Sequence, residues 1–143
     1  MKILKAVLVV MMIFPAAAWA QYKDLDAAVS GLQRGFEREE TQPVIEGIAT
    51  SDQVMLNFPG LVSKSGPFGR DQASYLLDEL FNKSNPSGFQ VVSARKVSAE
   101  GQYHINAKWT VTVGGKTADR DLYITLRNKD DRWAIVSITS AGK

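Results

Sequence analysis

The chain has 143 residues, of which 17 are basic, 15 are acidic and none is cysteine. The lack of cysteine excludes disulfides, thiolate metal sites and a lipid-modified cysteine, so this is not a lipoprotein. A chain of this length with an apolar fraction of 45% has room for one compact domain with a hydrophobic core.

The first twenty residues have the pattern of a secretory signal peptide. A basic start with two lysines precedes an apolar run that is too short to span a membrane, and the segment ends in Ala18-Trp19-Ala20. We expect cleavage between Ala20 and Gln21. The chain then divides into a signal peptide, residues 1–20, and one mature domain, residues 21–143.

Removal of this segment changes the charge balance. The segment contains two lysines and no acidic residue, so the mature domain has 17 − 2 = 15 basic groups against 15 acidic ones. A net charge near zero argues against nucleic acid as a partner, because nucleic-acid binding needs a basic surface. No later run approaches the roughly 18 apolar residues of a membrane helix. We expect a periplasmic or secreted bacterial protein that is soluble after cleavage and does not contact the membrane.

Apolar residues at helical spacing predict two long helices in the first half of the mature domain. The first helix is expected from about Asp24 to Glu39, with an apolar stripe formed by Leu25, Val29, Leu32 and Phe36. The second is expected from Arg70 to Lys83, before Asn85-Pro86, with a stripe formed by Ala73, Leu76, Leu77, Leu80 and Phe81.

Shorter elements are predicted between these helices. Thr41-Gln42-Pro43 indicates a cap followed by proline at the first position of a short helix. The alternation of Val54, Leu56 and Phe58 predicts a short strand. The segment from Ser63 to Gly69 is rich in serine, glycine and proline, so we expect a loop there.

The second half of the domain has the period of two that is typical of strands. Alternation from Tyr103 to Val113 is followed by Gly114-Gly115, which predicts a two-residue hairpin turn. Closing the hairpin there matches apolar residues with apolar ones and a basic residue with an acidic one, which supports this register. The matched pairs are Tyr103 with Leu126, Ile105 with Ile124, Ala107 with Leu122, and Lys108 with Asp121.

The last strand is expected to follow a four-residue turn from Asn128 to Asp131. This turn would place Trp133 opposite Leu126 and Ile135 opposite Ile124. The sheet would then be antiparallel, with Trp109 and Trp133 both on its apolar face.

The strand from Phe89 to Val97 has two candidate registers. A three-residue turn that ends at Gly101 points Phe89, Val91 and Val97 toward the apolar face, whereas a two-residue turn does not. We favour the three-residue turn.

This order of elements, helices first and then long meandering strands that end in Arg132-Trp133-Ala134-Ile135, resembles the nuclear-transport-factor-2-like fold. That fold is the cone shared with ketosteroid isomerase and scytalone dehydratase. The segments from Gly66 to Ala73 and from Leu80 to Lys83, with Trp133-x-Ile135, resemble a family of small secreted bacterial proteins known only as a domain of unknown function. The resemblance implies an α+β, cystatin-like cone over residues 21–143, with N-terminal helices on a curved, mainly antiparallel sheet. It implies no chemistry.

The isomerase branch of the resembled superfamily places a carboxylate base, a tyrosine and a protonated acid inside the cone. Here Asp119, Asp121 and His104, the only histidine, fall on the polar face of the predicted sheet. One histidine without cysteine does not make a usual zinc site. We therefore expect no catalytic residue, no metal site and no cofactor, and a module that binds a small ligand or a protein. The alternative is an isomerase- or dehydratase-like enzyme with a base inside the cone.

One charge interrupts the apolar face and suggests a ligand site. The hairpin register places Arg120 opposite Trp109, and Ser137 and Thr139 are expected nearby on the last strand. Arg120 either stacks on Trp109 at the rim, or it binds an anionic group of a small ligand while Trp109 forms an apolar wall. The loop from Gly66 to Arg70 would add backbone N–H groups beside this site.

The polar face carries a second candidate surface. Tyr123, Val136 and Ile138 are expected to cluster there. Such a cluster is either a homodimer interface through the sheet or an ordinary surface patch.

Overall fold

The computed structural model describes residues 24–49, 52–97, 101–129 and 131–141. The expected signal peptide and its cleavage site between Ala20 and Gln21 lie outside the described residues. Within the described ranges, no helix combines the length and the apolar character that a membrane crossing requires.

The two long helices form where the apolar stripes predict them. Helix α2 spans Leu25–Arg38, and Asp24 caps it because its carboxylate accepts a hydrogen bond of 2.8 Å from the backbone N–H of Ala27. Helix α4 spans Arg70–Ser84, and its C-cap residue Asn85 adopts a left-handed conformation with φ 44°. The predicted stripe of α4 is buried, and in α2 Leu32 and Phe36 are buried while Leu25 and Val29 are partly buried against the core, so both helices pack through those faces.

The short helix starts earlier than expected. Helix α3 spans Thr41–Ile45, so Pro43 occupies its third position rather than its first. Proline is tolerated there because the N–H groups of the first helical turn have no partner within the helix. Thr41 does not act as the cap, since its hydroxyl donates to the carboxylate of Asp78 on α4 and joins the two helices.

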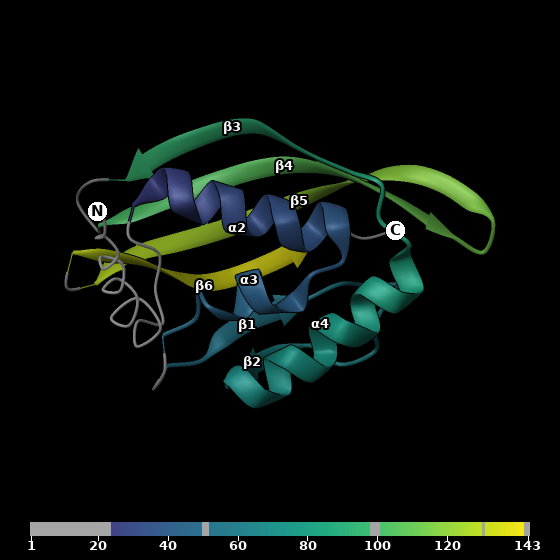
Figure 1. The fold of residues 1–143 in the computed structure, drawn as a ribbon, viewed down its shortest axis with the longest axis horizontal. Helices are drawn as coiled ribbons and strands as arrows, with labels where there is room; N and C mark the ends of the chain where they lie inside the picture. Colours follow the sequence, from purple (N-terminus) through teal and green to yellow (C-terminus); the bar gives the residue numbers. More distant parts are fainter. Residues whose placement is uncertain (1–23, 50–51, 98–100, 130, 142–143) are drawn as a thin grey trace, which may run out of the picture.

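Six strands form one sheet, on which the helices pack (Figure 1). The strands are β1 (Val54–Asn57), β2 (Gly66–Phe68), β3 (Gly88–Val97), β4 (Gln102–Val113), β5 (Lys116–Lys129) and β6 (Arg132–Ser140). Their order is β2-β1-β6-β5-β4-β3, and every neighbouring pair is antiparallel except β1 with β6. The predicted α+β architecture is therefore confirmed. The segment expected to be only a loop contains β2, whose three residues carry too little pattern to predict a strand.

The β4–β5 hairpin has the predicted register along its whole length. Val113 pairs with Lys116 at the turn, and Gln102 pairs with Arg127 at the far end. Gly114 and Gly115 have φ values of 60° and 80°, which only glycine adopts at low cost. We call the sheet face that packs on the helices the inner face and the opposite one the outer face.

The predicted register of β6 is wrong, because its pairing with β5 departs from the expected one at two points, the turn and a bulge. Lys129 pairs with Arg132, so the turn is tighter than expected, and Ile135 lies opposite Leu126 rather than Ile124. A bulge between Thr125 and Leu126 then changes the pairing again. A bulge reverses which side chains of a strand reach the core, and alternation alone does not reveal it. Trp133 still packs against the core, as expected.

The β3 strand agrees with the prediction at one end only. Phe89 and Val91 lie opposite Trp109 and Ala107 and pack in or against the core. Beyond a bulge between Val91 and Ser93, Val97 pairs with Gln102, so it does not share the face of Phe89. The three-residue turn is therefore wrong as a register, because it would have placed Val97 opposite Tyr103.

Candidate functional site

Aromatic side chains fill the space between the helices and the inner face. Trp109 is 0% exposed, and its indole N–H donates a 2.7 Å hydrogen bond to the backbone carbonyl of Phe36. The rings of Phe36 and Trp109 meet edge to face, with centroids 5.2 Å apart. Phe58, Phe81 and Phe89 complete this cluster around Phe36. Among the described residues the only buried polar side chains are Ser84 and Ser140, so no acid or histidine is buried there.

Arg120 lies opposite Trp109, as the hairpin register predicts. Its half-buried guanidinium donates a 2.9 Å hydrogen bond to the backbone carbonyl of Pro59. This bond accounts for how a charge is held on an apolar face, because a buried cation needs a polar partner. A ligand role for Trp109 and Arg120 stays a prediction.

Ser137 and Thr139 are not beside Arg120. The bulge in β6 places them opposite Thr125 and Tyr123 on the outer face. Sequence reasoning therefore assigned these two hydroxyl groups to the wrong face, for the same reason that it misplaced the register of β6.

The outer-face cluster also differs from the expected one. Ile138 is 0% exposed and belongs to the core, whereas Tyr123 is 44% exposed on the outer face. Val136 lies within the bulge and is half-buried. Met55 on β1, which is 42% exposed and pairs with Ser137 of β6, is an apolar outer-face residue that the sequence analysis missed. A dimer interface there stays a prediction.

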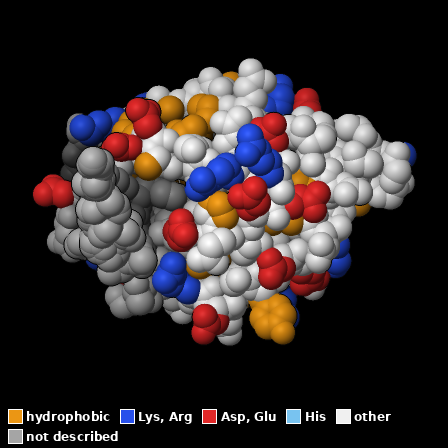
Figure 2. Space-filling model, in the orientation of Figure 1, with side chains coloured by type: hydrophobic (Ala, Val, Ile, Leu, Met, Phe, Trp, Pro, Cys, Tyr) orange, Lys and Arg blue, Asp and Glu red, His pale blue; other side chains and the backbone are white. Residues whose placement is uncertain are grey.

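The polar groups considered for catalysis face away from the core. Asp119 accepts a 2.7 Å hydrogen bond from the hydroxyl of Thr110, and Asp121 pairs with Lys108 across the hairpin. His104 forms a 3.1 Å hydrogen bond with the side-chain oxygen of Gln102. Among the described residues, no group of three metal-ligating side chains is present. Figure 2 shows acidic and basic side chains interspersed over the surface in view, rather than a field of one sign.

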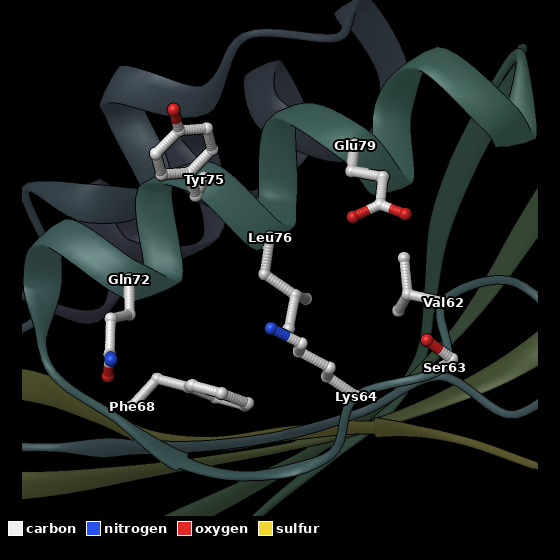
Figure 3. A pocket seen from close by; sticks show the side chains of 8 residues that line it. All are labelled: Val62, Ser63, Lys64, Phe68, Gln72, Tyr75, Leu76 and Glu79. Atoms are coloured by element: carbon white, nitrogen blue, oxygen red, sulfur yellow. The ribbon is translucent and has the colours of Figure 1, made fainter.

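An open cavity of about 460 Å³ lies between α4 and the chain that joins β1 to β2 (Figure 3). We call this cavity the α4 groove. Its floor is apolar and is formed by Val62, Phe68 and Leu76. Its rim is polar or amphipathic and is formed by Ser63, Lys64, Gln72, Tyr75 and Glu79. A volume of this size, with apolar walls and a few polar groups, is typical of small-molecule sites.

Helical spacing and two glycines build the α4 groove. Gln72, Leu76 and Glu79 recur at three and four residues, so they line one side of α4 together. Gly60 and Gly66 have φ values of 80° and 136°, which allow the chain to turn on either side of residues 61–65. The sequence analysis singled out Gly66 to Arg70 but did not locate this cavity, because a loop pattern does not fix where the loop packs.

Two charged side chains line the α4 groove, and only one of them, Glu79, forms an ion pair with a described residue. Glu79 forms a 3.0 Å ion pair with Lys83, one turn further along α4. Lys64 forms no ion pair with any described residue, and Figure 3 shows its ammonium group directed over the floor near Leu76. The groove therefore presents one unpaired cation above an apolar surface.

A second hollow, of about 470 Å³, lies at the start of α4 and is lined by Gln42, Ile45, Arg70, Asp71 and Ser74. Arg70 donates a 2.9 Å hydrogen bond to the backbone carbonyl of Ile45, so its charge helps to hold α3 against α4. An aspartate also lines this hollow. We therefore regard it as a weaker candidate for ligand binding than the α4 groove.

The architecture is that of the nuclear-transport-factor-2-like fold. A DUF4783 family protein from Bacteroides ovatus is similar, with a TM-score of 0.65 and 22% identity over 80% of this chain and 93% of that one. A nuclear-transport-factor-2-like protein of unknown function from Shewanella oneidensis has a TM-score of 0.61 and 18% identity over 83% of this chain and 98% of that one.

A second DUF4783 family protein, from Bacteroides fragilis, has a TM-score of 0.63 and 18% identity over 79% of this chain and 95% of that one. These similarities confirm the expected resemblance at the level of the fold. No family model and no curated protein matches the sequence. Function must therefore be argued from the residues of this chain.

Proposed function

We propose that this protein is an exported, non-catalytic binding module whose ligand site is the α4 groove. The observation that carries the proposal is an open, amphipathic cavity beside an interior that buried aromatic side chains occupy. A ligand beside Trp109 would have to displace the aromatic cluster around Phe36. The α4 groove needs no such rearrangement, and ligand pockets are usually largely formed before binding.

The enzyme alternative requires a proton-transfer group inside the cone. Such a group must lie within hydrogen-bond reach of the reacting atom. The described core holds no acid or histidine, which supports a binding role over an isomerase or dehydratase role.

The export part of the proposal rests on the N-terminal sequence pattern. N-terminal sequencing of the protein recovered from the periplasm or the medium should begin at Gln21. A chain that keeps Met1 and stays with the membrane fraction would show that the first segment is an anchor.

The groove is tested with a neutral probe, n-decanol, added to the exported protein labelled for amide NMR. We expect saturable shifts at Val62, Phe68 and Leu76. Gln72→Trp should fill the groove from its exposed rim and weaken decanol binding more than tenfold without unfolding the protein. Asn82→Trp places the same ring on an exposed position of α4 outside the groove and is the matched control.

Shifts at residues around Trp109 instead of at the groove floor would place the ligand inside the cone. Equal binding to Gln72→Trp and to the unaltered protein would also overturn the assignment.

A further inference from the structure

We infer that the α4 groove selects a single-chain amphiphile with a carboxylate head and an apolar tail. This inference rests on the proposed function and adds the chemical class of the ligand. Two features of the groove define that class, namely its floor and the single cation directed over it.

The floor of the groove indicates that the ligand has an apolar tail. Val62 and Leu76 are buried, and Phe68 is half-buried between the sheet edge and α4. Figure 3 shows Phe68, Leu76 and Val62 one after another along the groove, with the side chain of Lys64 among them. Burial of apolar surface is favourable, so an alkyl or aromatic tail laid on this floor would contribute to the affinity.

Tyr75 stands at the rim with an exposed aromatic ring. Its side chain is 81% exposed, which makes it the most exposed large apolar side chain of the described chain. It lies outside the apolar stripe of α4, so packing within the domain does not explain it. In Figure 3 its ring points away from Phe68 and Lys64, so contact with a tail is made by the floor and not by this ring.

Lys64 indicates that the head group of the ligand is negatively charged. Its ammonium lies over the apolar floor and has no carboxylate partner among the described residues. The nearest acid of the rim, Glu79, is occupied by Lys83 at 3.0 Å. An anionic head beside Lys64 would gain a charge-assisted contact, whereas a cationic head would be repelled.

The shape of the site favours a dissolved amphiphile over a membrane surface. A cavity of about 460 Å³ holds one tail, and the face that Figure 2 shows carries acidic and basic side chains interspersed, whereas an anionic bilayer is held by a basic field. We therefore assign the site to a dissolved carboxylate.

Three probes with one tail and three heads test this inference on the exported protein. They are decanoate, n-decanol and decyltrimethylammonium. We expect decanoate to bind about fivefold more tightly than decanol, a modest factor because Lys64 is exposed to solvent, and decyltrimethylammonium to bind most weakly. The preference for decanoate over decanol should shrink as salt rises from about 0.05 to 0.5 M.

Substitution of Lys64 separates the head from the tail. Lys64→Met keeps the apolar stem and should remove the preference for decanoate over decanol. Lys64→Glu should reverse the order of decanoate and decyltrimethylammonium. Lys96→Met removes an exposed lysine of β3 and is the control that should change neither.

Each result has one meaning. Equal affinity for all three heads would overturn the carboxylate assignment and leave the groove as a binding site. No shift at the groove floor with any probe would overturn both proposals. Binding to vesicles of phosphatidylglycerol without binding of decanoate would show that the cation serves a membrane surface instead.

Discussion

The cone interior and the α4 groove are both apolar, but they are packed differently. The interior is closed by five aromatic rings that contact one another around Phe36, and Trp109 has even its indole N–H satisfied by the backbone. The α4 groove has three apolar side chains on its floor and a rim of exposed ones. The difference indicates that stability resides in the interior and that binding, as proposed, is moved to the edge of the sheet.

This separation has a consequence for substitutions. A change in the interior should alter the free energy of unfolding and should affect binding only through unfolding. A change on the rim should do the reverse, because the rim residues are exposed and make few contacts that folding requires.

The largest effect is expected for Trp109→Ala. This change leaves a cavity and also removes the donor to the Phe36 carbonyl, so it should lower the free energy of unfolding by about 3 to 5 kcal/mol. Urea denaturation followed by circular dichroism would measure it. Trp133→Ala is the matched control, and its loss should be smaller because Trp133 is only half-buried. A loss at Trp133 equal to or greater than that at Trp109 would contradict the packing described above.

A smaller effect is expected for Arg120→Met. This change keeps an apolar stem beside Trp109 but removes the hydrogen bond to the Pro59 carbonyl, so stability should fall by about 1 kcal/mol. Binding of decanoate should not change. Lys64→Met should show the opposite pattern, with unchanged stability and weaker decanoate binding. A loss of decanoate binding in Arg120→Met with folding intact would move the ligand site to the cone mouth, where the sequence analysis placed it.

The sequence predicted the parts of the fold that local pattern determines. Gly114-Gly115 and the matched pairs of β4 and β5 specify one register, and the structure has it. The bulges in β3 and β6 escaped prediction because a single extra residue leaves the alternation on either side intact.

The candidate site depends on contacts that local pattern does not describe. Arg120 opposite Trp109 was predictable because both lie on the same hairpin. The α4 groove joins a loop to a helix that follows it, and the position of residues 61–64 is set by how α4 packs on the sheet. No feature of the sequence around Lys64 therefore distinguished it from the other lysines.

The smallest effect on folding is expected for Tyr123→Ser on the outer face. Tyr123 is 44% exposed, so its loss should change the free energy of unfolding by less than about 0.5 kcal/mol. With Ile138 in the core, a dimer interface on the outer face would depend on Tyr123 of the predicted cluster and on Met55, which the sequence analysis did not include; they lie on β5 and β1. A two-fold interface presents each patch to its own copy, so one substitution removes the ring from both sides of the contact.

Sedimentation equilibrium should show concentration-dependent pairing of the unaltered protein that is weaker in Tyr123→Ser. Thr110→Ser, on the same face near the hairpin tip, is the control and should pair normally. An unaltered protein that sediments as a monomer throughout the micromolar range would mark the outer face as an ordinary surface and leave the α4 groove as the site to study.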